Sequence, residues 1–137
     1  MKLSEKTKNN LKELGAGVIY LFGSRSIGVA LDKSDYDIGV VFVNAKLLHD
    51  FSNVRLRVYD ILSDEFPDMF YGPRLDISFL QEANPALEMA AVKYGKVLFE
   101  DSPSFRADYE ESVIRRYDDY LPLKNEYEHA TFSAFTG

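Results

Sequence analysis

Apolar positions along the chain form several short, strand-like stretches. Residues 18–22, Val-Ile-Tyr-Leu-Phe, are a continuous apolar run that is typical of a buried strand. Residues 35–43 are rich in β-branched side chains, and residues 74–80 alternate apolar and polar positions, so both predict strands. We expect a fourth short strand at residues 96–99, Lys-Val-Leu-Phe.

Helical spacing of apolar residues occupies the intervals between these strands. Residues 4–14 carry leucines among lysines and glutamates and are followed by glycine, which predicts an exposed amphipathic helix. A short helix is expected at residues 24–31 and a loop at residues 66–73. Residues 46–64 predict one helix. Its expected apolar face consists of Leu47, Leu48, Phe51, Val54, Leu56, Val58, Ile61 and Leu62.

The C-terminal third predicts two further helices. Asn84 and Pro85 suit an N-cap and a first helical position, so a helix should run from there to Tyr94. A last helix is expected at residues 104–120, ending before a proline, and the aromatic-containing tail that follows it shows no clear period. The whole pattern predicts an α/β protein of the α+β type, with a small mixed β-sheet of about four strands and helices packed on it.

Length and composition favour one domain in a reducing compartment. A chain of 137 residues with 46% hydrophobic content suits a single domain at 1–137, with its core at about 15–100 and a C-terminal helix and tail at 104–137. There is no cysteine, which excludes disulfides and thiolate metal sites. The polar N-terminus and the lack of a long apolar segment predict a cytoplasmic protein without a membrane association.

The net charge of -6, from 22 acidic and 16 basic residues, disfavours direct binding of a long nucleic acid. It does not exclude a nucleotide, because a few well-placed cations and a bound metal ion can neutralise a triphosphate. The charge therefore narrows the candidate ligands to small ones.

Three aspartates are the strongest candidates for chemistry. Asp35 and Asp37 lie two apart on a predicted strand, and the period of two places both carboxylates on one face. Two carboxylates held this close repel each other unless a cation lies between them, and their oxygen atoms are ligands that suit Mg²⁺. Asp76 should point away from its apolar neighbours. If its strand lies beside that of Asp37, the three carboxylates form a two-metal site, in which Asp76 can also act as general base.

A candidate phosphate-binding loop follows the first strand. Gly23 ends that strand and allows close approach of the backbone to a phosphate. Ser24 offers a hydroxyl donor, and Arg25 is the nearest cation, at the start of the expected short helix. Each of the three residues also has an ordinary structural interpretation, as a turn, an N-cap or a surface residue. Their spacing from the aspartates favours the functional one.

These motifs together resemble a known superfamily. Residues 23–28 read Gly-Ser-Arg-Ser-Ile-Gly and residues 34–40 read Ser-Asp-Tyr-Asp-Ile-Gly-Val, with Asp76 on a later strand. This pattern is similar to the signature of the DNA polymerase β-like nucleotidyltransferases, and in its short form it resembles the minimal nucleotidyltransferase (MNT) proteins of prokaryotes. The resemblance covers about residues 18–80 most strongly. Ile27 departs from it, because relatives often carry a second arginine there.

The resemblance implies an activity and a partner. MNT proteins often act as antitoxins beside a HEPN ribonuclease toxin, and members of that group transfer AMP from ATP to a toxin tyrosine. It implies ATP as substrate, two Mg²⁺ ions and a possible hetero-oligomer with the toxin. The implied catalytic and metal-binding residues are Asp35, Asp37 and Asp76, and the implied nucleotide-binding residues are Gly23, Ser24 and Arg25. Two alternatives stay open: a small-molecule acceptor of the aminoglycoside type, and a binding antitoxin without catalysis.

Overall fold

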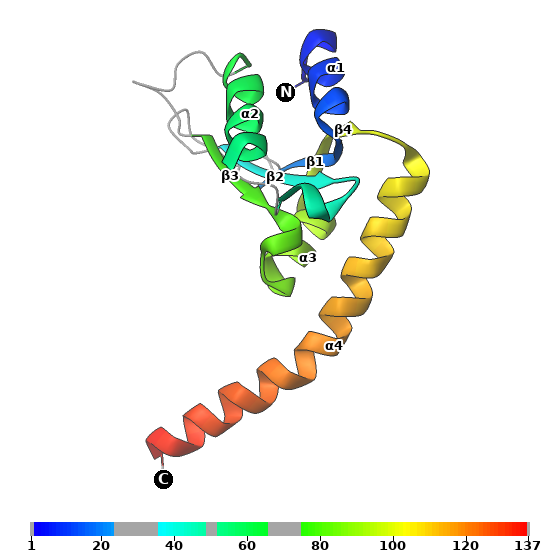
Figure 1. Ribbon diagram of the computed structural model, residues 1–137. Coiled ribbons are helices and arrows are strands. Elements are labelled where there is room, and N and C mark those ends of the chain that lie inside the picture. Colours follow the sequence, from blue (N-terminus) through cyan, green and yellow to red (C-terminus); the bar gives the residue numbers. More distant parts are fainter. Residues whose placement is uncertain (1, 24–35, 49–51, 66–74, 137) are drawn as a thin grey trace.

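A computed structural model describes residues 2–23, 36–48, 52–65 and 75–136 (Figure 1). Its four strands form one sheet in the order β3-β2-β1-β4. Their bounds are β1 Ala16–Phe22, β2 Tyr36–Phe42, β3 Leu75–Phe79 and β4 Lys96–Glu100. β1 pairs with β2 and with β4 in antiparallel fashion, whereas β2 and β3 are parallel. The expected small mixed sheet is confirmed.

The helices follow the expected order, with short 3-10 turns between them. Their bounds are α1 Glu5–Leu14, η2 Ala45–Leu48, α2 Ser52–Ser63, η3 Leu80–Glu82, α3 Pro85–Tyr94 and α4 Pro103–Thr136. Ser4 caps α1 by accepting a hydrogen bond from the Thr7 backbone N–H, and Gly15 ends α1 with a φ of 101°. Asn84 caps α3 by accepting from the Leu87 N–H, as its sequence position predicts.

Two apolar layers cover the two faces of the sheet (Figure 1). One layer joins α1 and α2 to the sheet through Leu11, Val58 and Leu62, against strand residues such as Ile38 and Ile77. The other layer joins α3 and α4 to the opposite face. Its buried members are Val18, Tyr20, Phe22, Val41, Leu80, Ala91, Tyr109 and Val113. β1 contributes residues to both layers, and because it lies between them it is buried along its whole length.

The strand β1 begins two residues earlier than the apolar run predicts. Ala16 already pairs with Phe42, and Gly17 lies under α4. A Cβ at Gly17 would overlap the ring of Phe105, so the missing side chain is what allows α4 to approach the sheet here. Small residues that resemble a turn in the sequence are therefore part of the sheet.

The expected helix at residues 46–64 is wrong in two respects. The chain forms a 3-10 turn at Ala45–Leu48 and starts a new helix at Ser52. Within α2, Val54, Val58 and Leu62 recur every four residues and face the core, whereas Leu56 lies on the opposite side and is 60% exposed. Leu56 therefore does not belong to the apolar face.

The last helix does not end before Pro122. α4 extends from Pro103 to Thr136, through the proline and through most of the tail that had no clear period. A proline removes one backbone donor and displaces the carbonyl one turn earlier, which bends a helix without ending it when the turns on both sides persist. Figure 1 shows α4 changing direction in its orange part.

The predicted short helix at residues 24–31, the predicted loop at residues 66–73, and Ser24, Arg25 and Asp35 lie outside the described residues.

Candidate active site

Asp37 and Asp76 are direct neighbours on adjacent parallel strands. The register pairs Asp37 with Asp76 and Ile38 with Ile77. Adjacent strands are spaced about 4.8 Å apart, and paired residues share a face, so the two side chains leave the sheet side by side. Asp76 is exposed and Asp37 is half-buried. The strand pairing on which the aspartate site depends is therefore present.

Both carboxylates lie on the sheet face that α3 and α4 cover. Asp37 pairs across β1 with Phe22, which belongs to the α3/α4 layer. The residues next to the aspartates, Ile38 and Ile77, pack into the opposite layer with α1 and α2. Side chains alternate between the two faces along β2 and β3, so the burial of Ile38 and Ile77 in one layer places the aspartate side chains on the other face. A register slip by one residue would reverse the faces.

Gly23 directly adjoins the Asp37 carboxylate. It follows the last residue of β1 and has a φ of 75°, a left-handed conformation that favours glycine. A Cβ at this position would overlap Oδ2 of Asp37 and would lie 3.2 Å from its Cγ. The end of β1 therefore lies beside the starts of β2 and β3. At this edge of the sheet, formed by strand ends, the backbone of Gly23 is close to the two carboxylates.

Asp35, Ser24 and Arg25 lie outside the part of the chain that the structure describes. Among the described residues, histidines, aspartates and glutamates do not form a group of three that could hold a metal ion. Asp37 and Asp76 supply two oxygen-ligand side chains at one place, which is a hard, anionic donor set that fits Mg²⁺.

The far end of β2 is held by a side chain that the sequence pattern does not single out. The amide of Gln81 accepts a hydrogen bond from the Phe42 N–H (2.8 Å) and donates one to the Phe42 carbonyl (2.9 Å). These two bonds continue the β2–β3 ladder after β3 has turned into η3. Leu80, beside it, lies over Gly39, where a Cβ would be only 2.8 Å from its Cδ1. Both contacts keep β3 in register with β2.

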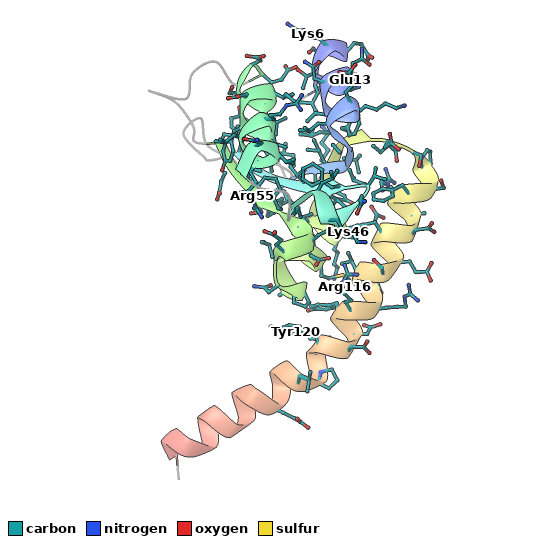
Figure 2. All side chains as sticks on the ribbon, in the orientation of Figure 1. Lys6, Glu13, Lys46, Arg55, Arg116 and Tyr120 are labelled. Atoms are coloured by element: carbon teal, nitrogen blue, oxygen red, sulfur yellow. The ribbon has the colours of Figure 1, made fainter. Side chains whose placement is uncertain are left out.

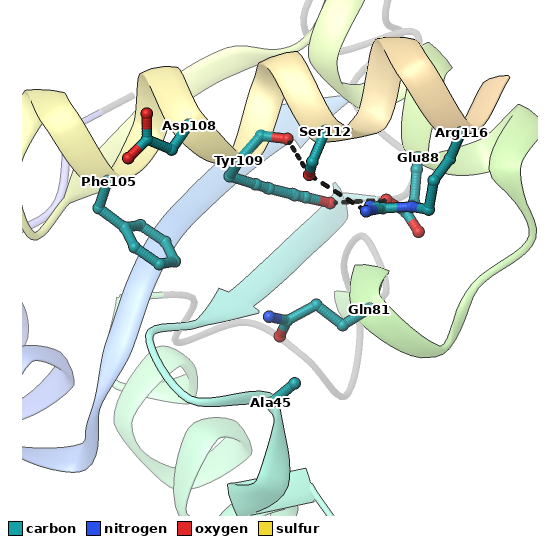
Figure 3. Close-up of a pocket in the computed structure, with 8 residues that line it drawn as sticks. All are labelled: Ala45, Gln81, Glu88, Phe105, Asp108, Tyr109, Ser112 and Arg116. Atoms are coloured by element: carbon teal, nitrogen blue, oxygen red, sulfur yellow. Dashed lines mark hydrogen bonds and ion pairs between the residues drawn. The ribbon is translucent and has the colours of Figure 1, made fainter. Parts of the chain in front are cut away.

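A cavity of about 490 Å³ lies under α4, at the Gln81 end of β2 (Figure 3). Its wall includes Glu88, Tyr109 and Arg116. The Tyr109 hydroxyl donates to Glu88 Oε2 (3.1 Å), and the Arg116 guanidinium lies 2.6 Å from the same oxygen. Phe42, which Gln81 binds, is five residues from Asp37, or roughly 17 Å along the strand. The cavity is therefore separate from the aspartates.

Two tyrosines hold α4 to the rest of the protein. Burial raises the pKa of Tyr109, and the negative charge of Glu88 adds to the effect. Burial likewise raises the pKa of Tyr20, whose hydroxyl donates to Glu110 at 2.8 Å. Arg106 lies 3.4 Å from Glu110. These polar contacts join α4 to α3 and to β1, the strand that Gly23 follows.

Comparison with known proteins identifies the family. Residues 4–104 match the family described as Polymerase beta, Nucleotidyltransferase. The chain belongs to this family. A search of curated proteins finds no match. For a nucleotidyltransferase of this kind, the edge of the sheet at Gly23, Asp37 and Asp76 is the candidate active site.

Solved structures share the whole fold. A chain of a toxin–antitoxin complex with AMP-PNP is 22% identical with a TM-score of 0.66, over 97% of this chain and 99% of that one. A chain from a tri-AMPylated Shewanella oneidensis HEPN toxin in complex with MNT antitoxin is 21% identical with a TM-score of 0.58, over the same shares. A chain of the MntA-HepT toxin–antitoxin is 20% identical with a TM-score of 0.57, over 96% and 99%. The similarity includes α4.

In the described part of the chain, the helices are too short or too polar to cross a bilayer.

Proposed function

We propose that this nucleotidyltransferase transfers AMP from ATP, with Mg²⁺, to a tyrosine hydroxyl of a cognate HEPN toxin and thereby acts as its antitoxin. The observation that carries the proposal is the pairing of Asp37 with Asp76 on parallel strands, with Gly23 against the Asp37 carboxylate. Two carboxylates and a close backbone turn at one sheet edge are what a metal-bound triphosphate needs.

The proposed reaction forms a bond between the acceptor oxygen and the α-phosphorus of ATP and breaks the bond to the β-phosphate, releasing pyrophosphate. Asp37 and Asp76, with Asp35, would hold the Mg²⁺ ions, which supply charge neutralisation for the triphosphate and the leaving group. Asp76, the exposed member of the pair, would accept the proton of the hydroxyl. Gly23, Ser24 and Arg25 would bind the β- and γ-phosphates.

The identity of the acceptor rests on the relatives. Chains with this fold come from toxin–antitoxin complexes, one of which contains AMP-PNP and another a tri-AMPylated HEPN toxin with its MNT antitoxin. The match covers 99% of each of these two chains, so they share the whole fold with this chain and not only the nucleotidyltransferase core.

The test is AMP transfer from α-labelled ATP to the cognate HEPN toxin. Asp37→Asn should reduce transfer by at least about 10³-fold, because it removes a charged ligand from the site. Asp60→Asn is the matched control, because Asp60 is an exposed aspartate on α2, away from the site. Both proteins should unfold at the same temperature as the unmodified protein.

Undiminished transfer by Asp37→Asn would contradict the site. Transfer to an aminoglycoside in place of the toxin would identify a small-molecule enzyme. Neutralisation of the toxin by Asp37→Asn without any transfer would identify a binding antitoxin.

A further inference from the structure

The second half of α4 leaves the body of the protein. Figure 1 shows the yellow part of α4 beside α3 and the sheet, and its orange and red part extending away with no other described element beside it. The change comes near Tyr120, which Figure 2 labels beside α4. Residues 121–136 are all helical, and at 1.5 Å per residue they extend about 24 Å. We call them the distal arm.

A helix in this position is unstable by itself. Short isolated helices are marginal in water, and most helical stability in proteins comes from burial of an apolar face. The second residue of the distal arm is Pro122, and a proline inside a helix costs about 3 kcal/mol. Leu123, directly after it, is 67% exposed. The distal arm thus has the features of a segment whose stability depends on contact with a partner.

The charge around Leu123 indicates the kind of partner. The arm itself has Glu126 and Glu128 against Lys124, a net charge of -1, and Asp118 and Asp119 lie in the turn of α4 just before it. Residues 117–137 together carry a net charge of -3, half of the -6 of the whole chain. Asp118, Asp119 and Glu126 are exposed. An apolar side chain flanked by carboxylates is complementary to a partner with an apolar strip bordered by lysine or arginine.

We propose that the distal arm is the docking site for the acceptor protein, and that it binds a surface of that protein which is basic at its rim and apolar at its centre. The proposal rests on the proposed function, which supplies the HEPN toxin as acceptor. The arm provides affinity for the toxin, whereas the aspartate site provides the chemistry.

The first test is the affinity of the toxin for the full-length protein, measured by calorimetry with a HEPN protein that has been made inactive as a ribonuclease. Leu123→Asp should weaken binding at least about tenfold, because a buried apolar contact at an interface centre is lost. Leu56→Asp is the matched control: Leu56 is a leucine of similar exposure, 60%, on α2 at the other face of the sheet. It should bind within about twofold of the unmodified protein. Affinity should also fall as ionic strength rises.

The second test separates docking from catalysis. Leu123→Asp should transfer AMP slowly at low toxin concentration and at the normal rate at saturating toxin. Asp37→Asn should bind the toxin normally and transfer nothing. Deletion of residues 121–137 should abolish measurable binding.

Unchanged toxin affinity of Leu123→Asp, or failure of the unmodified protein to bind, would overturn the proposal. A dimer that Leu123→Asp converts to a monomer, with toxin affinity intact, would instead assign the arm to a second copy of this chain. Failure of AMP transfer by a protein that binds the toxin through Leu123 would overturn the proposed function and leave the docking site standing.

Discussion

Replacing Gly23 by alanine tests the geometry of the proposed site, and Gly15 offers a control with the same backbone strain. Gly23 has a φ of 75° and Gly15 a φ of 101°. Alanine at either position therefore loses about 1–2 kcal/mol to the left-handed conformation. For 137 residues the entropy of unfolding is about 0.3 kcal/mol per kelvin, so each variant should melt about 3–7 °C lower.

The two variants should differ in activity. A Cβ at Gly23 overlaps Oδ2 of Asp37, so the carboxylate has to move by about 1 Å, a displacement that can cost about 100-fold in rate. A Cβ at Gly15 meets Cδ1 of Leu47 at 2.8 Å, at the flexible end of an apolar side chain beside α1. Gly15→Ala should therefore lose stability and keep its rate of transfer.

The assay is the rate of AMP transfer at saturating ATP and toxin, at least 15 °C below the lower melting temperature. A Gly23→Ala rate within about threefold of the unmodified protein would show that the glycine does not support the Asp37 carboxylate. An equal loss of rate in Gly15→Ala would show that the effect is one of general stability.

Two further substitutions test the contacts that hold α4 and β3 in place. Burial raises the pKa of Tyr109 in the folded state. The neutral phenol therefore contributes stability that is complete below the unfolded pKa near 10 and is lost as pH rises above it. Tyr109→Phe should lower the free energy of unfolding by about 1.5–3 kcal/mol at pH 8, through loss of the bond to Glu88, and should weaken the alkaline decline seen in urea unfolding between pH 8 and about 11. An identical alkaline slope would contradict this. Gln81→Leu deprives the Phe42 N–H and carbonyl of their partner and should cost about 2–4 kcal/mol. A loss below about 0.5 kcal/mol would mean that water replaces the amide.

Local pattern was sufficient to locate the strands, and alternation in residues 75–79 correctly placed Asp76 opposite its apolar neighbours. It could not establish that β3 lies beside β2, because parallel pairing joins segments more than thirty residues apart and no short-range signal encodes it. The register that pairs Asp37 with Asp76 comes from the structure alone. So does the double hydrogen bond of Gln81, since a glutamine at the start of a turn has no distinctive sequence pattern.

Helix ends were harder to predict where two principles compete. Pro122 predicts a stop, and the lack of apolar period after it supports a loose tail, yet α4 continues to Thr136. A period is expected only where a helix packs on its own domain, so its absence in the distal arm is consistent with a helix that projects from the body. The misassigned Leu56 has a similar cause. The 3-10 turn of η2 and the α-helix α2 have different periods, which a single periodicity over residues 46–64 hides.

The placement of α4 connects the two proposals. Asp37 pairs with Phe22 on the sheet face that α3 and α4 cover, and α4 leaves the body on that same side. A protein bound to the distal arm therefore approaches the face that carries the proposed catalytic carboxylates, whereas a protein bound at Leu56 on α2 would be on the opposite face of the sheet. Tyr20 and Glu110 fix the first half of α4 to β1, and β1 leads into the turn at Gly23. Toxin affinity at Leu123 should consequently raise the local concentration of the acceptor hydroxyl at Asp76, and transfer to a free tyrosine-containing peptide, which lacks a surface for the arm, should be unaffected by Leu123→Asp.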